Sequence, residues 1–154
     1  MRLTNLRIEN FRLLRDIELG LEDRTTLIVG RNNSGKTSIA EIFRRLLSEK
    51  TLSFRLEDFS LGCHEQFWNA FAAFSAGAEV SDVLNLLPSI RVTLDISYDV
   101  NSPDLGPLGD CIIDLDPECK HARLVLTFAP VPNATAMLFA DLPLPQEGMA
   151  NART

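Results

Sequence analysis

Residues 30–37 read Gly-Arg-Asn-Asn-Ser-Gly-Lys-Thr and fill every position of the pattern Gly-x-x-x-x-Gly-Lys-Ser/Thr. The apolar run 26–29 precedes this stretch and a helical pattern follows it, which is the strand–loop–helix context that a phosphate-binding loop (P-loop) requires. The two glycines allow a tight loop whose backbone N–H groups turn toward phosphate oxygens. The positive end of the following helix points at the same anion. The stretch therefore predicts a site for nucleotide phosphates, and the alternative is a chance match on a polar turn.

Two side chains of this loop have predicted chemical roles. Lys36 supplies a mobile cation for the β- and γ-phosphates, and Thr37 supplies a hydroxyl for Mg²⁺. The predicted binding residues are the whole loop and the first turn of the helix after it: Gly30, Arg31, Asn32, Asn33, Ser34, Gly35, Lys36, Thr37 and Ser38.

Length and charge limit the class of protein. The chain has 154 residues, one domain's worth, with 45% hydrophobic and 23% charged residues, which is ordinary for a globular protein. The net charge of −6 is uneven, because residues 1–50 hold ten Lys/Arg against seven Asp/Glu and residues 51–154 hold five against fourteen. An acidic second part is a poor partner for a nucleic-acid backbone.

Membrane and metal classes have little support in the sequence. No apolar stretch approaches the ~20 residues of a membrane span, and the strand-like start lacks a signal peptide. The three cysteines form no C-x-x-C pair, which fits a reducing cytoplasm. Cys63-His64, Cys111 and Cys119-x-His121 hold enough ligands for zinc, but none has zinc-finger spacing. The favoured interpretation is that these cysteine and histidine residues bind no metal.

Periodicity predicts the elements around the loop. Residues 6–11 and 17–21 are predicted strands, and residues 25–29 a buried third strand that leads into the P-loop. The helix is predicted from Lys36 to about Ser48, because apolar residues recur at helical spacing: Ile39, Ile42, Phe43, Leu46 and Leu47.

The spacing of apolar residues changes in the second part of the chain. Residues 50–89 are rich in aromatic side chains, for which core packing is favoured over a base-stacking platform, and a short helix is expected between Ser81 and Pro88. From Ile90 the period becomes two, which predicts a strand over 90–98 with one wet face. Further strands are predicted at 112–113, 124–128 and 137–140, as an antiparallel meander.

These patterns predict four regions. They are a P-loop core (1–49), an aromatic-rich helical insertion (50–89), an antiparallel β-subdomain (90–142) and a flexible tail (143–154).

The first 47 residues resemble the amino-terminal lobe of ABC-type ATPases of the RecF/SMC branch, and most closely the OLD family (overcoming lysogenization defect). The resemblance rests on Leu6-x-Ile8-x-Asn10-Phe11-Arg12, Asp16-Ile17 and residues 26–38, in which Arg31-Asn32-Asn33 replaces the commoner Pro-Asn-Gly. It implies an α/β fold of the P-loop NTPase type: an ABC-type N-terminal lobe with a mixed sheet around the P-loop helix and an antiparallel β-subdomain. It implies ATP and Mg²⁺ as cofactors.

The resemblance also implies partners. Such ATPases close two nucleotides between two heads, so the expected partner is a second ATPase head, in a homodimer or a higher oligomer. A Toprim nuclease commonly follows the ATPase in OLD proteins, and DNA repair or antiviral defence would then involve DNA only through other parts of the protein. Arg12, at the end of the first strand, is expected to approach the phosphates as a second cation, and the alternative is a surface arginine on a sheet edge.

Sequence motifs that the resembled family needs for ATP hydrolysis have no clear match in this chain. The family needs a Walker B run ending in Asp-Glu, a signature motif and a Q-loop glutamine. Residues 74–79 imitate a signature, and Asp95 has roughly the spacing of a Walker B aspartate. Arg91 and Thr93 interrupt the run before Asp95, and Asp114 breaks the second similar run, 111–116, so coincidence is the favoured interpretation. Gln66 as a Q-loop residue is only a guess.

Three classes of function follow. The first is the ATP-binding lobe of an OLD/RecF/SMC-type ATPase that is inactive without its missing parts. The second is an assembly or dimerisation module in which ATP acts as a clamp with little or no hydrolysis. A small GTPase or kinase is the third, and it lacks the guanine-reading Asn-Lys-x-Asp motif.

Overall fold

A computed structural model describes residues 1–48, 53–99 and 120–139. The chain forms two compact units, the first made of Met1–Ser60 and Ile90–Thr127 and the second of Leu61–Ser89 and Phe128–Thr154. The elements in chain order are β1 (Arg2–Phe11), β2 (Leu14–Gly20), α1 (Lys36–Ser48), η1 (Leu56–Asp58), η2 (Leu61–Cys63), α2 (His64–Ser75), α3 (Val80–Leu86), β3 (Ile90–Ser97), β4 (His121–Phe128) and α4 (Pro132–Phe139).

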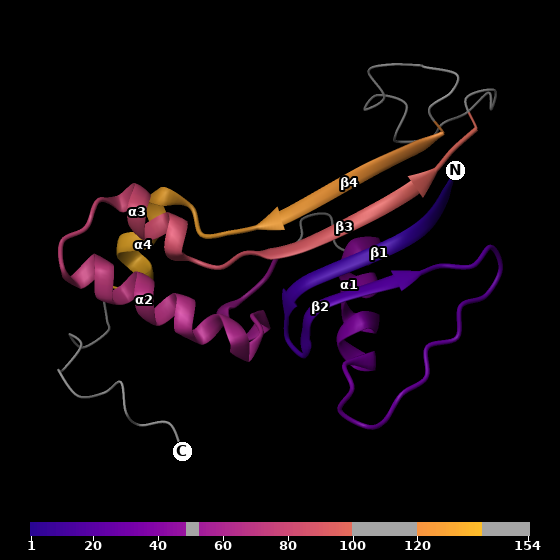
Figure 1. The fold of residues 1–154 in the computed structure, drawn as a ribbon, viewed down its shortest axis with the longest axis horizontal. Helices are drawn as coiled ribbons and strands as arrows, with labels where there is room; N and C mark the ends of the chain where they lie inside the picture. Colours follow the sequence, from indigo (N-terminus) through magenta and orange to yellow (C-terminus); the bar gives the residue numbers. More distant parts are fainter. Residues whose placement is uncertain (49–52, 100–119, 140–154) are drawn as a thin grey trace. The chain divides into compact units, whose positions relative to one another are not determined.

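The first unit is built on a four-stranded sheet in the order β2-β1-β3-β4 (Figure 1). β1 pairs antiparallel with both β2 and β3, and β4 runs opposite to β3 (Figure 1). The predicted mixed sheet is therefore wrong for the described residues, because every neighbouring pair of strands is antiparallel. The strand over 90–98 is confirmed as β3, which pairs with the first strand of the chain.

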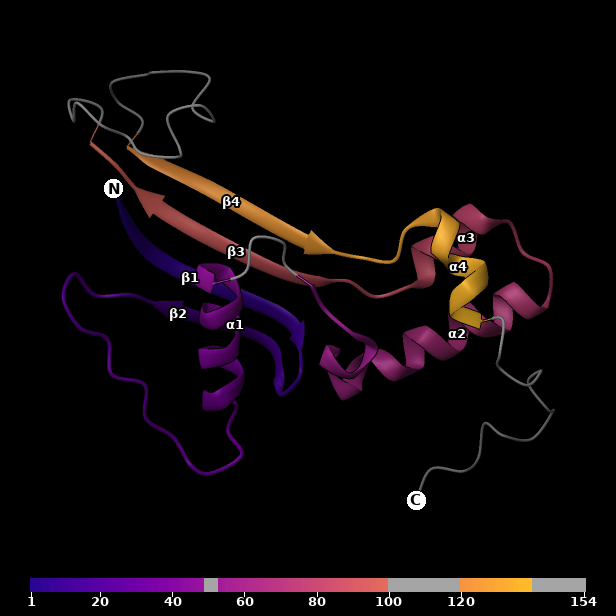
Figure 2. The same ribbon diagram turned by 180° about the vertical axis from the view of Figure 1, so that it is seen from behind.

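The sheet has one apolar and one charged face. Leu6 and Ile8 are fully buried, and Ile8 stands opposite both Ile17 and Val92 in the register. Period-two alternation places these side chains on one face. α1 lies over that part of the sheet, behind it in Figure 1 and in front of it in Figure 2, and buries Ile39 and Ile42.

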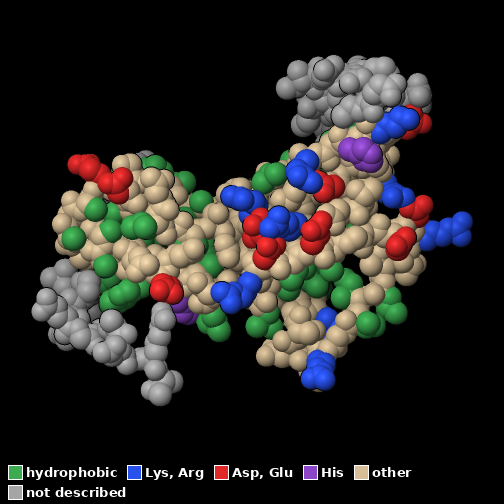
Figure 3. Space-filling model, in the orientation of Figure 1, with side chains coloured by type: hydrophobic (Ala, Val, Ile, Leu, Met, Phe, Trp, Pro, Cys, Tyr) green, Lys and Arg blue, Asp and Glu red, His purple; other side chains and the backbone are tan. Residues whose placement is uncertain are grey.

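The opposite face of the sheet carries paired charges. Lys/Arg and Asp/Glu side chains gather together over the strands on the face seen in Figure 3. Arg7 forms a bidentate pair with Asp16 at 2.8 Å, and Arg123 lies 2.6 Å from Asp95. Asp95 is therefore a member of an exposed ion pair on β3, which agrees with the interpretation that its Walker B-like spacing is a coincidence.

The second unit is a small cluster of α2, α3 and α4. Ala70, Phe71, Val83 and Phe139 are buried together, and the Phe139 ring lies 5.5 Å from Phe71 and 5.3 Å from Phe74, measured between centroids. These aromatic side chains pack in a core, as the sequence favoured.

The predicted strand at 137–140 is wrong for its described residues. Met137–Phe139 belong to α4, which begins at Pro132, a residue whose fixed φ suits the first helical position. Among the side chains of α4 that the structure describes, Thr135, Leu138 and Phe139 are buried or half-buried, and their helical spacing turns them to one face. The predicted strand 112–113 and the tail 143–154 lie outside the described residues.

The segment before the P-loop is also not the predicted strand. Residues 25–31 have no regular secondary structure, and Leu27 and Val29 are 82% and 79% exposed. A strand exists only through the ladder of hydrogen bonds to a neighbour, and the described residues form no ladder with this segment. The apolar run 26–29 therefore has no strand partner in the described part of the chain.

Candidate nucleotide-binding site

The P-loop forms one wall of a pocket of about 310 Å³, lined by Leu13, Asn32, Asn33, Ser34, Gly35, Lys36, Thr37 and Ser38. The structure thus brings together seven of the nine predicted loop residues, and Gly30 and Arg31 lie at the entry to the same loop. The sequence did not indicate Leu13, which reaches the pocket from the turn between β1 and β2.

Gly35 is required by both its conformation and its surroundings. Its φ is +89°, a region that side chains disfavour. A Cβ atom at this position would stand 2.6 Å from Cδ2 of Leu14, which is itself buried. The loop backbone therefore packs directly on the β1–β2 turn, and only glycine permits this approach.

Lys36 closes the loop on itself. Its Nζ donates to the carbonyl oxygens of Gly30 and Arg31, both at 2.6 Å, and lies 3.4 Å from the Ser34 hydroxyl. Within the described segments the ammonium group is held by exposed loop oxygens and by no carboxylate. A phosphate can compete with these neutral acceptors, because charge-assisted hydrogen bonds are the stronger ones.

The start of α1 is suited to an anion. The helix begins at Lys36, and its first turn contains no acidic side chain, so the partial positive charge of its free N–H groups is not neutralised locally. Thr37 is exposed in the pocket and Ser38 is buried. A threonine hydroxyl fits Mg²⁺ bound mainly by phosphate oxygens and water. No cluster of three or more His, Cys, Asp or Glu suited to a metal occurs in the described segments.

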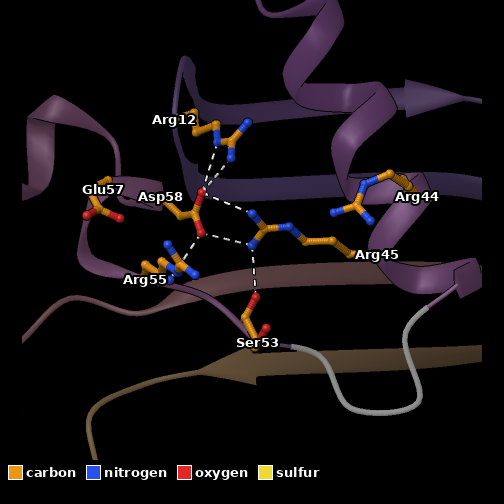
Figure 4. Close-up of a pocket in the computed structure, with 7 residues that line it drawn as sticks. All are labelled: Arg12, Arg44, Arg45, Ser53, Arg55, Glu57 and Asp58. Atoms are coloured by element: carbon orange, nitrogen blue, oxygen red, sulfur yellow. Dashed lines mark hydrogen bonds and ion pairs between the residues drawn. The ribbon is translucent and has the colours of Figure 1, made fainter.

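Arg12 lies outside the P-loop pocket. Its side chain lines a second pocket of about 490 Å³ together with Arg44, Arg45, Ser53, Arg55, Glu57 and Asp58 (Figure 4). Its Nε and Nη2 lie 2.9 and 2.8 Å from Oδ1 of Asp58. Arg12 is nevertheless adjacent to Leu13 of the P-loop pocket, and its approach to the phosphates stays a prediction.

Asp58 and Arg45 form a buried ion pair that the sequence analysis missed. Arg45 donates to Asp58 from Nη1 at 2.8 Å and from Nη2 at 3.2 Å, and both residues are less than a tenth exposed. Leu47, expected on the buried face of α1, is instead 83% exposed. A signal was present, since Arg45 lies three residues after Ile42 on the apolar face, where a charge needs a partner.

Arginine side chains of this pocket lower the pKa values of two carboxyl groups. Burial by itself raises the pKa of Asp58, but hydrogen bonds from Arg45, the Arg55 N–H and Arg12 outweigh it and hold that pKa below its ordinary value. Hydrogen bonds from Arg44 and then Arg45 lower the pKa of Glu41 to about 2.

We predict that acid weakens the fold through these two carboxylates. Because their folded pKa values lie below the unfolded ones, their contribution is complete above the unfolded pKa and is lost as the pH falls through the folded pKa. For Glu41 the window runs from 4.5 down to about 2. Urea unfolding followed by circular dichroism between pH 7 and 2.5 should show a falling free energy of unfolding. Glu41→Gln should flatten this slope, and an unchanged slope would contradict the assignment.

The described helices include none long and apolar enough to cross a membrane.

Comparison with known proteins places the chain in a family. The family model described as "AAA ATPase domain" matches residues 1–125. "DNA replication and repair protein RecF" of Actinobacillus pleuropneumoniae serotype 5b (strain L20) is 37% identical over 70 residues, which cover 40% of this chain and 19% of that protein, and the same protein of serotype 3 (strain JL03) matches equally. The aligned part is thus about a fifth of the length of these relatives. Because the family model covers most of the chain and includes the whole P-loop, the chain belongs to the AAA ATPase domain family.

Proposed function

We propose that this chain is the ATP-binding lobe of a RecF/SMC-type ATPase, of the OLD kind within that branch, and that the complete protein processes DNA. The observation that carries the proposal is the P-loop pocket, in which Gly35, Lys36 and Thr37 stand together at the start of α1. The similarity to RecF supports the RecF/SMC branch. The Arg31-Asn32-Asn33 sequence supports the OLD kind.

The roles of the loop residues follow from the geometry. The loop N–H groups and the start of α1 would bind phosphate oxygens, and Lys36 would exchange its loop carbonyls for the β- and γ-phosphates. The Thr37 hydroxyl would hold Mg²⁺, which neutralises phosphate charge when bound. Leu13 would shield one side of the phosphates from water, since it is the apolar residue in the pocket wall.

The lobe lacks a base for hydrolysis among its described residues. No described Asp or Glu lines the P-loop pocket, and attack by water needs a positioned carboxylate. We propose that a second ATPase head and further chain supply this group, in a homodimer or higher oligomer. DNA would bind through other parts of the protein, because the charges on the described sheet face are paired with one another.

The same observation favours a second function. A P-loop pocket with no carboxylate in its described wall also suits an assembly module that binds ATP and hydrolyses it slowly or not at all. The two functions differ in the complete protein, where only the first predicts Lys36-dependent turnover.

Thr37→Ala tests the site. We expect ATP to bind about tenfold more weakly in the presence of Mg²⁺, the loss of one ligand to a charged group, and to bind almost unchanged in EDTA. Titration calorimetry with and without Mg²⁺ measures both. Thr25→Ala, an exposed threonine outside the pocket, is the control. Equal losses with and without Mg²⁺ would contradict the metal role of Thr37.

A further inference from the structure

Asp58 is the centre of the second pocket (Figure 4). It is 4% exposed, and its carboxylate accepts hydrogen bonds from three chain segments. These are the Arg12 side chain at the end of β1, the Arg45 side chain in the last turn of α1 and the Arg55 N–H, at 2.9, 2.8 and 3.0 Å. Three of the four guanidinium groups in this pocket, those of Arg12, Arg44 and Arg45, already donate to carboxylates. The geometry therefore fits a clamp, in which Asp58 joins the three segments to one another, better than a binding site for a free anion.

The clamp holds the β1–β2 turn by both backbone and side chain. The Arg12 N–H donates to the Asp58 carbonyl oxygen at 2.8 Å, in addition to the ion pair between the side chains. Arg12 has φ +50°, in the left-handed region that is unfavourable for a residue with a Cβ. Such a conformation persists only where its surroundings fix it.

The turn held in this way is one wall of the nucleotide site. Leu13 lines the P-loop pocket, and Leu14 is buried against Gly35. Asp58 does not line that pocket, so it acts on the P-loop indirectly. It is joined to the loop through the turn, and also through Arg45 of α1, the helix that begins at Lys36.

We propose that Asp58 is a positioning residue for nucleotide binding, which fixes Arg12 and thereby seats Leu13 and Leu14 against the P-loop. The proposal rests on the proposed function, because it concerns the same site. Without the carboxylate, Arg12 loses its partner, the strained turn relaxes and the support behind Gly35 loosens. The P-loop then loses more conformational entropy when it binds phosphate, which weakens the binding.

The test is a double-mutant cycle on ATP affinity. Asp58→Asn and Arg12→Ala should each weaken Mg-ATP binding about tenfold. The double variant should lose little more than Asp58→Asn alone, because Arg12 acts through its contact with Asp58. Asp95→Asn is the matched control, a carboxylate paired with Arg123 on the charged sheet face, and should bind like the wild type. Affinities are measured below the unfolding transition of every variant, so that a loss of stability does not imitate a loss of affinity.

Hydrogen exchange gives a second readout. In Asp58→Asn the amides of Leu13, Leu14 and Gly35 should exchange faster, whereas those of β3 should not. Because Asp58 also pairs with buried Arg45, its variant could fail to fold. The Arg12 side chain is 37% exposed, so Arg12→Ala serves as the second variant. Its ATP affinity and the hydrogen exchange of the same amides then test the positioning role without Asp58→Asn.

The outcomes separate this proposal from the nucleotide site itself. Wild-type binding that is lost in Lys36→Ala but unchanged in folded Asp58→Asn overturns the positioning role alone. Additive losses in the cycle overturn it too, as does unchanged affinity or unchanged exchange in Arg12→Ala. Wild-type protein that binds no ATP overturns the proposed function instead.

Discussion

Lys36→Ala is expected to abolish measurable Mg-ATP binding while the fold stays intact. Among the described residues the Lys36 ammonium contacts only oxygens of the loop, so its removal takes no contact from the core. In the complex it would donate to two charged phosphates, and a bond of this kind contributes about 1.5–3 kcal/mol. The expected loss is therefore about 100-fold or more in affinity.

Titration calorimetry measures this loss, and thermal unfolding followed by circular dichroism verifies the fold. Lys120→Ala is the matched control, since Lys120 is exposed just before β4, outside the P-loop pocket. If Lys36→Ala binds ATP as tightly as the wild type, the nucleotide site has been placed wrongly.

The second large effect is expected for hydrolysis. The 154-residue chain should release phosphate from ATP at the rate seen without protein. Lys36 and the start of α1 can bind and orient phosphates, but the described wall of the pocket offers no carboxylate to position water. The charge that builds on the γ-phosphate in the transition state also needs donors from outside the loop.

A phosphate-release assay at saturating Mg-ATP tests this, with Lys36→Ala beside the wild type and with the complete protein as the positive case. The complete protein should hydrolyse ATP as an oligomer and lose this activity in Lys36→Ala. Robust, Lys36-dependent turnover by the 154-residue chain would refute the prediction. Asp95 and Asp114 would then have to be reconsidered as catalytic carboxylates.

Local patterns predicted the elements whose buried face shows a clear period in contiguous residues. α1 was predicted from Lys36 to about Ser48 and has these bounds, because a helix satisfies its own backbone and its apolar spacing marks the buried face. The two-residue period from Ile90 predicted β3 equally well. The P-loop residues were found by motif, and the structure gathers seven of the nine in one pocket.

Short apolar runs without a clear period were predicted less well. The run 26–29 has the composition of a strand, yet in the described chain it lacks a neighbouring strand and stays exposed. Met137–Phe139 read equally well as a strand, but packing of Phe139 on Phe71 and Phe74 favours a helix. A short apolar segment is compatible with either a strand or a helix, and its tertiary partner decides between them.

The sequence by itself determined the phosphate-binding loop, the helix after it and the likeness to the RecF/SMC branch, since each is encoded in contiguous residues. Only the tertiary structure decided that the sheet is antiparallel, that Leu13 lines the pocket and that Asp58 joins Arg12 to Arg45. Asp58 is 46 residues from Arg12 and 13 from Arg45. No periodicity links positions at such separations, and a buried carboxylate takes its partners from whichever chain segments the fold brings to it.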